Sequence, residues 1–477
     1  MRQMLTGYKM SDANRLDLAV YSNYSKSVPY YTSYPVLSQW QEFYQARDYR
    51  AALSDFCKTS GDEPVSIYVH FPYCAKMCWY CICNFAVTHN RETIQRFLRH
   101  LHKEIDMLGD VFDAHDFKPN ITDIHLGGGT PSYMENEEVG ALLEKLERLQ
   151  RPGCEKELTI EIDIRTATRE NVEYYAELGI QRLSFGIQDF NADVQKAINR
   201  EQTPERFHEV FPTELRGHFN SFNFDLLYGL PKQTIGSFRE TMDIVTDLRP
   251  SRVTLLKYAH TPELRKHMRL IDTADLPDEL TNKVIFDNAI QQFKNAGYNH
   301  IGIDHFALDT DRLSEADKNK HVGRSFLGFN PSQFQHLLGL GPSSTACFGN
   351  YYFQNISPIA QYCDLIAQGD FAIERGYTLN IDDVIRREVI FAILCDRRVD
   401  LKEIASKYGI DAYEYFADEL DSLVPLIRDG VMQLEGGVIT VTELGRLYIQ
   451  HICVRFDGHI DAEHYQLAGP TIITASA

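Results

Sequence analysis

Residues 66–84, SIYVHFPYCAKMCWYCICN, join a short run of β-branched and aromatic residues to a compact group of cysteines. The run 66–71 has the composition of a buried β-strand. Cys74, Cys78 and Cys81 follow it in a C-x-x-x-C-x-x-C arrangement. A structural zinc site takes four ligands, usually as two close pairs, whereas three close thiolates suit a 4Fe–4S cluster with one open iron. The spacing therefore predicts an iron–sulfur site, with zinc or plain buried cysteines as the alternative.

Strands of the same kind recur along the chain, and stretches of helical period separate them. Strands are expected at 66–71, 121–126, 158–163, 182–187, 222–229, 252–258 and 299–304. This alternation indicates βαβ units and a parallel sheet. Polar residues on the strands, such as Glu161, Asp163 and Asp225, favour a sheet curled around a site over a flat sheet that is apolar on both faces. The sequence therefore predicts an α/β fold with an incomplete barrel of about six βα units.

The two ends of the chain follow other patterns. Residues 27–35, SVPYYTSYP, predict an extended arm, because prolines disfavour a helix there. Amphipathic segments from residue 382 onward lead to a hairpin signal at Gly436-Gly437. We therefore expect an arm and cover at 1–60, the partial barrel at 61–310, a barrel extension at 311–381, and a mainly helical, winged-helix-like domain at 382–477.

The charge balance argues against several classes of protein. The 477 residues include 48 Lys+Arg and 67 Asp+Glu, a formal net charge of −19. Such a chain is not expected to bind nucleic acid or an anionic membrane surface. No apolar run reaches the roughly 20 residues that span a bilayer, and residues 1–17 lack the apolar core of a signal peptide. The expected location is the cytoplasm.

A glycine run, Gly127-Gly128-Gly129, follows the second expected strand and precedes Thr130 and Pro131. Consecutive glycines let backbone N–H groups approach a ligand without obstruction by a Cβ atom. A tight turn is the alternative interpretation. The residues alone leave both interpretations open.

The cysteine motif at the end of the first strand of a partial barrel resembles the radical S-adenosylmethionine (SAM) superfamily, in which an aromatic residue such as Tyr80 usually precedes the last cysteine. Further segments resemble the oxygen-independent coproporphyrinogen III oxidase family: YTSYP (31–35), YVHFPYC (68–74), GGGTP (127–131), QDFNADVQ (188–195), NREQ (199–202), FDLLYGLPKQT (224–234), YAH (258–260) and DHFA (304–307). The resemblance implies anaerobic oxidative decarboxylation of two propionates of coproporphyrinogen III to vinyl groups, giving protoporphyrinogen IX. A 5′-deoxyadenosyl radical derived from SAM would begin the reaction.

The resemblance also implies roles for individual residues. The implied cluster ligands are Cys74, Cys78 and Cys81. The implied contacts to SAM on the cluster are Tyr68, Gly128, Glu161 and Thr345, and those to a second SAM are Tyr80, Gly129, Thr130, Gln188, Arg200, Asp225 and Ala259. Tyr68, His70 and Glu161 are the expected catalytic residues, and His305 also matches a family histidine. Cys83 is present in the family without being a ligand.

Several residues depart from the family pattern: Tyr30 replaces an arginine, Ile82 a glycine, Phe85 a lysine, Thr345 an isoleucine, and 326–333 a more polar run. These departures leave two alternative functions open. The protein could be a paralogue that uses two-SAM chemistry for methyl or methylene transfer or for haem modification, or a haem-binding chaperone without turnover. A tetracarboxylate substrate needs cations, for which the candidates are Arg165, Arg182, Lys232 and Lys257. The expected partners are a tetrapyrrole and a flavodoxin- or ferredoxin-type electron donor, and the expected state is a monomer.

Overall fold

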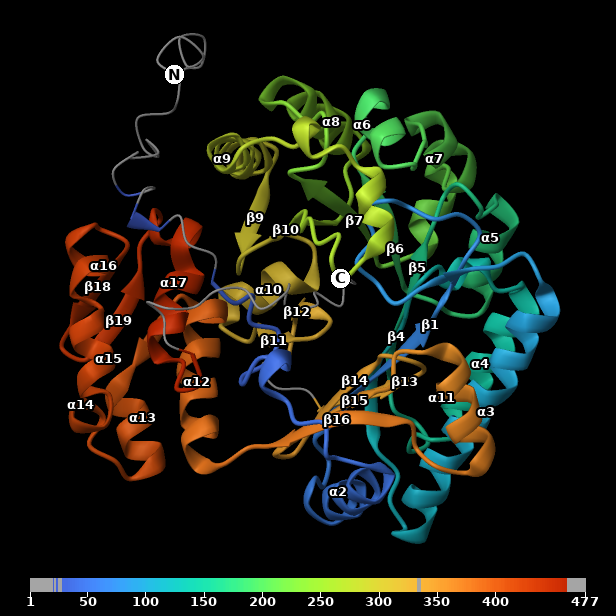
Figure 1. Ribbon diagram of the computed structural model, residues 1–477, viewed down its shortest axis with the longest axis horizontal. Helices are drawn as coiled ribbons and strands as arrows, with labels where there is room; N and C mark the ends of the chain where they lie inside the picture. The colour runs from blue at the N-terminus through green and yellow to red at the C-terminus, as the bar shows by residue number, and fades with distance from the viewer. Residues whose placement is uncertain (1–19, 21–22, 25–27, 333–335, 461–477) are drawn as a thin grey trace.

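Six parallel strands form the centre of the protein (Figure 1). The structure is a computed structural model that describes residues 20, 23–24, 28–332 and 336–460. The strands are β1 (Pro64–Phe71), β4 (Asn120–Gly128), β5 (Glu157–Ile162), β6 (Arg182–Gln188), β7 (Ser221–Tyr228) and β8 (Arg252–Lys257), and each pairs in parallel with the next. The prediction of an incomplete six-unit barrel is confirmed.

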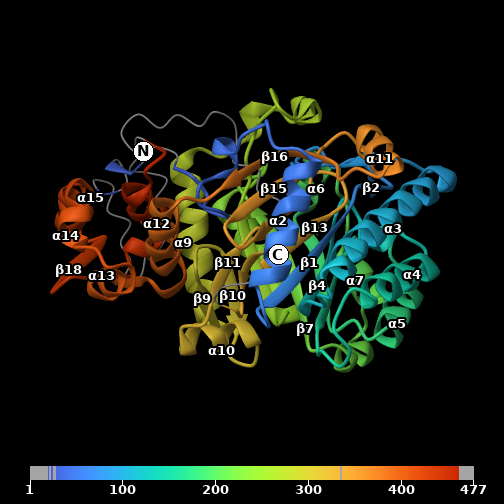
Figure 2. The ribbon, with the colours of Figure 1, turned by 90° about the horizontal axis from the view of Figure 1, so that it is seen from below.

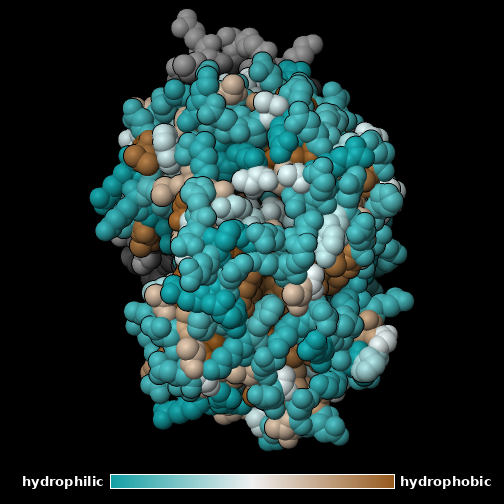
Figure 3. Space-filling view, turned by 90° about the vertical axis from the view of Figure 1, so that its right-hand side faces the viewer, coloured by the Kyte–Doolittle hydropathy of each residue, from teal (hydrophilic) through white to brown (hydrophobic). Residues whose placement is uncertain are grey.

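Helices connect these strands and cover the outside of the sheet (Figures 1 and 2). They are α3 (Arg91–Ala114), α4 (Asn136–Glu147), α5 (Arg169–Glu177), α6 (Ala192–Ala197), α7 (Pro204–Val210), α8 (Ile235–Leu248) and α9 (Glu279–Asn295). Helix α3 shows why they form: the Asn90 side chain accepts hydrogen bonds from the first turn, and residues such as Ile94, Leu101 and Leu108 at helical spacing are buried. The outer faces on the α3–α5 side are mainly hydrophilic (Figure 3).

The sheet continues beyond the six parallel strands on both edges. At one edge the order is β8, β10 (His305–Leu308) and β9 (Tyr298–Ile301), paired antiparallel. At the other edge β13 (His336–Leu340) pairs in parallel with β1, and β14 (Thr345–Phe348), β15 (Tyr351–Asn355) and β16 (Ile373–Thr378) follow antiparallel. The strand expected at 299–304 ends at Ile301. Strands β13–β16 were not among the strands expected from the sequence. Only β13 pairs with β1, which lies far away in the sequence, and the other three follow it as a meander.

The C-terminal region forms a separate apolar cluster on the other side of the barrel from α3–α5 (Figure 2). Its helices are α12 (Ile381–Asp396), α13 (Leu401–Tyr408), α14 (Ala412–Tyr415), α15 (Ala417–Ser422), α16 (Val424–Arg428) and α17 (Ile449–Cys453). A small sheet has the order β17 (Arg398–Asp400), β19 (Val438–Val441), β18 (Met432–Glu435). The predicted turn is confirmed: Gly436 and Gly437 have φ of +60° and +92°, as a two-residue hairpin turn requires.

The described residues also form α2 (Ala46–Thr59), β2 (Tyr73–Cys74), β3 (Ala86–Val87), α10 (Arg312–Asn319), β11 (Gly323–Ser325), β12 (Gly328–Asn330) and α11 (Ile359–Gln368). Among the residues that the structure describes, no helix is long and apolar enough to cross a membrane.

The expected arm at 27–35 runs without a helix over its described part, residues 28–35, and residue 27 lies outside the described residues. Tyr31 and Tyr34 are fully buried in the C-terminal apolar cluster. The Tyr31 hydroxyl donates to Asp457 at 2.9 Å, and the Gly458 N–H donates to the Tyr34 hydroxyl at 2.9 Å. The arm therefore attaches the C-terminal region to the rest of the chain.

Buried Glu104 ties α3 to the antiparallel part of the sheet. Its carboxylate accepts from the Gly341 N–H at 2.7 Å, from the Asn355 amide at 2.7 Å and from the Tyr362 hydroxyl at 2.6 Å. Glu104→Ala leaves three buried donors without this acceptor, so we expect it to lower the free energy of unfolding by about 2–4 kcal/mol. Urea unfolding monitored by circular dichroism measures the change. Asp110→Ala, on an exposed position of the same helix, is the matched control.

Candidate active site

A cavity opens where the parallel strands end. Its lining includes twelve of the residues expected from the sequence: Cys74, Cys78, Tyr80, Cys81, Gly128, Gly129, Thr130, Glu161, Gln188, Arg200, Asp225 and Ala259. The carboxyl ends of parallel strands form one rim in such barrels, and the loops that follow them carry the functional groups. The fold therefore brings together residues from at least five separate βα units.

The loop that carries the three cysteines is held on both sides by backbone contacts. The Trp79 N–H donates to the Ile198 carbonyl at 3.0 Å, and the Asn199 amide donates to the Met77 carbonyl at 2.7 Å. From the opposite direction, His267 Nε2 donates to the Cys81 carbonyl at 2.7 Å. These anchors fix the loop over the cavity independently of any bound group.

The glycine run passes too close to β1 for side chains. A Cβ atom on Gly129 would lie 2.8 Å from the Pro72 carbonyl carbon, and the Gly129 N–H donates to the Phe71 carbonyl at 2.7 Å. Gly128 has a φ of +112°, and a Cβ atom there would lie 2.8 Å from the His70 ring. Glycine is therefore required at both positions by the contact with β1.

Glu161, on β5, is held at the mouth by two described contacts. Its carboxylate accepts from His125 Nε2 at 3.0 Å and from the Gly128 N–H at 3.2 Å. Burial lowers the pKa of His125 to about 4, so this histidine is neutral and donates its Nε2 proton. The carboxylate thus joins the second and third βα units at the level of the glycine run.

Tyr68 and His70 form a buried chain behind Gly128 and are not among the described residues that line the cavity. His70 Nε2 donates to the Asn84 carbonyl at 2.8 Å, which leaves Nδ1 to accept from the Tyr68 hydroxyl at 3.1 Å. Burial lowers the pKa of His70 to about 4. His70 is therefore neutral, and its ring supports the glycine run from below.

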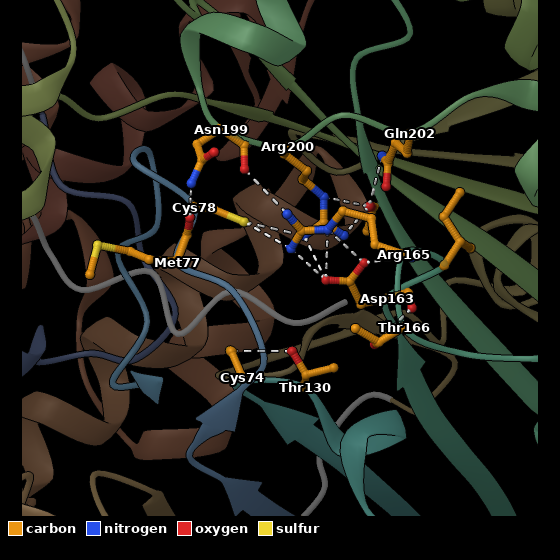
Figure 4. A network of polar contacts seen from close by, with 12 residues as sticks. Cys74, Met77, Cys78, Thr130, Asp163, Arg165, Thr166, Asn199, Arg200 and Gln202 are labelled. Atoms are coloured by element: carbon orange, nitrogen blue, oxygen red, sulfur yellow. Dashed lines mark hydrogen bonds and ion pairs between the residues drawn. The ribbon is translucent and has the colours of Figure 1, made fainter. Parts of the chain in front are cut away.

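The guanidinium groups of Arg165 and Arg200 lie between the sulfur of Cys78 and the carboxylate of Asp163 (Figure 4). Arg165 Nη2 lies 3.1 Å and Arg200 Nη1 3.4 Å from this sulfur. The same nitrogens lie 2.6 Å and 3.2 Å from Asp163 Oδ2. Burial alone would raise the pKa of Asp163, but the charges of Arg200 and Arg165 hold it well below its usual range. Thr130 donates in the same way to Cys74 Sγ, at 3.2 Å.

Asp225, on β7, lies deeper in the barrel. It accepts from the Ser184 hydroxyl at 2.9 Å and from the Asn223 amide at 2.8 Å. Burial, together with the negative charge of Glu161, raises the pKa of Asp225 to about 7. Near neutral pH, a ligand that donates hydrogen bonds to this group therefore favours its ionised form.

Other residues named from the sequence lie away from the cavity lining. Thr345 is buried on β14, and His305, on β10, lies 2.5 Å from Asp304. Among the candidate cations, Lys257 lines the cavity but pairs with Glu279 at 2.6 Å. Arg182 begins β6 and therefore lies at the opposite end of the barrel, which corrects its selection as a substrate cation.

The structure adds lining residues that the sequence analysis did not select: Lys76, Ile162, Asp163, Gly186, Leu227, Leu256 and Tyr258. From the sequence, Asp163 is expected only as a polar residue on a strand. Its position directly after β5 is a stronger sign of a site residue, because the carboxyl ends of the strands form the rim of the barrel. The departures Ile82 and Phe85 line the cavity, whereas Tyr30 lies over the Arg324 guanidinium, 4.7 Å from it.

The three cysteines fit a cluster better than a single metal ion. No group of three or more described His, Cys, Asp or Glu side chains could hold one ion. A zinc ion needs sulfurs that converge at about 2.3 Å from one centre, whereas each thiolate of a cubane binds a different iron. All three cysteines are free thiols that line one cavity, and hydrogen-bond donors point at the sulfurs of Cys74 and Cys78.

Comparison with known proteins agrees with this geometry. The family model "Radical SAM superfamily" matches residues 68–245, and "HemN C-terminal domain" matches residues 379–448. The oxygen-independent coproporphyrinogen III oxidase of Salmonella typhimurium is 36% identical over 445 residues, covering 93% of this chain and 95% of the relative. The enzyme of the same name from Pseudomonas aeruginosa is 36% identical over 459 residues, covering 96% and 99%.

A solved structure extends the likeness to the whole fold. The radical SAM enzyme coproporphyrinogen III oxidase (HemN) from Escherichia coli superimposes with a TM-score of 0.86 at 34% identity, covering 94% of this chain and 99% of that one. Fold and site thus define a radical SAM protein. The chain belongs to the oxygen-independent coproporphyrinogen III oxidase family.

Replacing Asp225 tests the electrostatics of the cavity. Its folded-state pKa of about 7 lies above the ordinary value of 3.8, so between these values the native state binds more protons than the unfolded state. Native stability is therefore lost as pH rises from 4 to 7. The Asp225→Asn variant lacks this titrating group. We therefore expect the free energy of unfolding of the variant, minus that of the wild type, to rise by up to about 1.4 kcal/mol per pH unit over this range.

Urea unfolding at pH 5, 6 and 7 gives this difference. Asp110→Asn, at an exposed position of α3, is the control for exchanging a carboxyl group for an amide. A difference between Asp225→Asn and wild type that does not change with pH contradicts the prediction.

Proposed function

We propose that this protein converts coproporphyrinogen III to protoporphyrinogen IX without oxygen, by oxidative decarboxylation of two propionate side chains. The observation that carries the proposal is the joint lining of one cavity by the three cysteines and by nine of the eleven residues matched to SAM contacts. The alignments with the two relatives named for this activity cover 95% and 99% of those relatives.

The cofactors are a 4Fe–4S cluster and SAM. We assign Cys74, Cys78 and Cys81 as the thiolate ligands, held by the backbone anchors of their loop. When bound, the cluster and SAM together supply a radical able to take a hydrogen atom from the β-carbon of a propionate. Tyr68, His70 and Glu161 are proposed to position SAM at the glycine run. The apolar lining residues Leu227 and Leu256 exclude water.

A second SAM is proposed in the same cavity. Arg200 offers a guanidinium to its carboxylate, and Asp225 accepts from its ribose hydroxyls. Tyr80, Gly129, Thr130, Gln188 and Ala259 complete the proposed contacts, and all of them line the cavity. Thr345 is assigned to the first SAM by family match.

A flavodoxin- or ferredoxin-type protein is proposed as the electron donor. Lys76 and Met77, next to Cys78, are exposed, so the cysteine loop reaches the surface where such a donor docks. We further propose a monomer that works in the cytoplasm. The four-part division at residues 60, 310 and 381 also stays a proposal, with the arm and the C-terminal region covering the barrel mouth.

An anaerobic assay tests the activity. Protein reconstituted with iron and sulfide is incubated with coproporphyrinogen III, SAM and reduced flavodoxin, and products are read by mass spectrometry. We expect loss of two carbon dioxide molecules per substrate and formation of 5′-deoxyadenosine. Contradicting outcomes are a mass gain with S-adenosylhomocysteine, which indicates a transferase, and tight haem binding without SAM cleavage, which indicates a chaperone.

A pair of cysteine variants tests the ligand assignment. Cys78→Ala removes one of three thiolates, so we expect it to lose the iron–sulfur absorbance after reconstitution, with iron content falling by about tenfold. Cys83→Ala is the matched control, because Cys83 lines the same cavity two residues after Cys81 and is assigned no ligand role. Equal iron content in the two variants disproves the assignment.

A further inference from the structure

The wall of the cavity next to Cys78 holds more positive than negative charge. The side chains of Asp163, Arg165 and Arg200 are only 8%, 12% and 7% exposed. One carboxylate thus serves two guanidinium groups, both within 3.2 Å, so the trio carries one surplus positive charge. A buried charge without a partner is costly, so the site requires an additional anion.

The remaining carboxyl groups of the cavity have partners elsewhere. Glu161 contacts His125 and the Gly128 N–H, and Asp225 accepts from Ser184 and Asn223. Both guanidinium groups of the trio instead direct a nitrogen at the Cys78 sulfur, at 3.1 Å and 3.4 Å. Figure 4 shows the two groups side by side, between this sulfur and the Asp163 carboxylate. Cys78 is therefore the position at which one anion faces both guanidinium groups at once.

Hydrogen bonds fix the turn that carries Asp163 and Arg165. Asp163 Oδ1 accepts from the Arg165 backbone N–H at 3.0 Å, and its own N–H donates to the Ser132 hydroxyl at 3.1 Å. Arg165 Nη1 also donates to the Asn199 carbonyl, at 3.2 Å. Arg165 is thus held by its backbone, by Asp163 and by Asn199, and its position does not depend on a ligand.

We propose that Asp163, Arg165 and Arg200 form a fixed counter-charge for the anionic iron–sulfur cluster at Cys78, and that Arg165 is a positioning residue that raises the cluster's reduction potential. This proposal rests on the proposed function. A cluster held by three thiolates is negatively charged, and reduction adds one electron from an external donor. An adjacent cation and hydrogen bonds to a ligand sulfur stabilise the reduced form more than the oxidised form.

Redox titration of the reconstituted protein without SAM tests the proposal. Dithionite supplies the electron, and electron paramagnetic resonance measures the reduced cluster. Arg165→Gln removes the charge and the directed donor, so we expect a ratio of reduced to oxidised cluster about tenfold lower than in the wild type at a fixed potential. Arg165→Lys keeps the charge and is expected to restore part of the ratio.

Two further variants separate charge from structural damage. Asp163→Asn increases the surplus positive charge, so we expect the ratio to rise, opposite to Arg165→Gln. Arg206→Gln is the matched control, because Arg206 binds the carbonyls of Ile164 and Ala167 in the same turn at 2.9 Å and 2.7 Å without a described contact to a cysteine. Its ratio should equal that of the wild type.

The results have distinct meanings. An Arg165→Gln ratio equal to that of the wild type overturns the counter-charge, and so does an equal fall in Arg165→Gln, Asp163→Asn and Arg206→Gln. Iron and sulfide analysis of each sample shows whether a cluster is present. A wild-type protein that never binds one refutes the proposed function itself rather than the role of Arg165.

Discussion

The close approach of the glycine run to the end of β1 is the constraint on which the site depends. The Gly129 N–H contacts the Phe71 carbonyl, and Gly128 covers the His70 ring. This packing brings the end of β4 against the start of the cysteine loop. Any side chain at these glycines would push the two strand ends apart. The cysteines and the glycine run then could not line one cavity.

Polar groups inside the barrel are arranged in two electrostatic zones. Around Cys78, two guanidinium groups outnumber one carboxylate. Deeper in the barrel, burial shifts the equilibrium of Asp225 toward its neutral form. An acidic chain of net charge −19 thus keeps a local positive field at the cysteine loop. That contrast suits a site that binds anionic sulfur ligands and carboxylate-bearing molecules, because each anion meets a buried cation instead of another carboxylate.

Much of the fold was predictable because the parallel strands are short apolar runs separated by helical stretches. The positions expected for β1, β4, β5, β6, β7 and β8 agree with the structure within a few residues. Strand β13 and the antiparallel strands β14–β16 were not predictable in this way. The register of β13 is set by β1, which lies more than 250 residues earlier, and β14–β16 join the sheet through β13. Only the folded sheet shows that residues 336–378 extend it.

The sequence by itself determined the identity of the chemistry-bearing groups. These groups form local patterns: three cysteines at fixed spacing after one strand, and a glycine run after the next strand. Local patterns can be recognised in the sequence without the tertiary structure. Tertiary structure alone decided how those groups interact. Asp163 and Arg165 follow β5 and Arg200 follows β6, yet they meet at Cys78 because parallel strands end at one rim. The tertiary structure also placed Arg182 at the far end of the barrel, because the first and last residues of a strand lie at opposite rims.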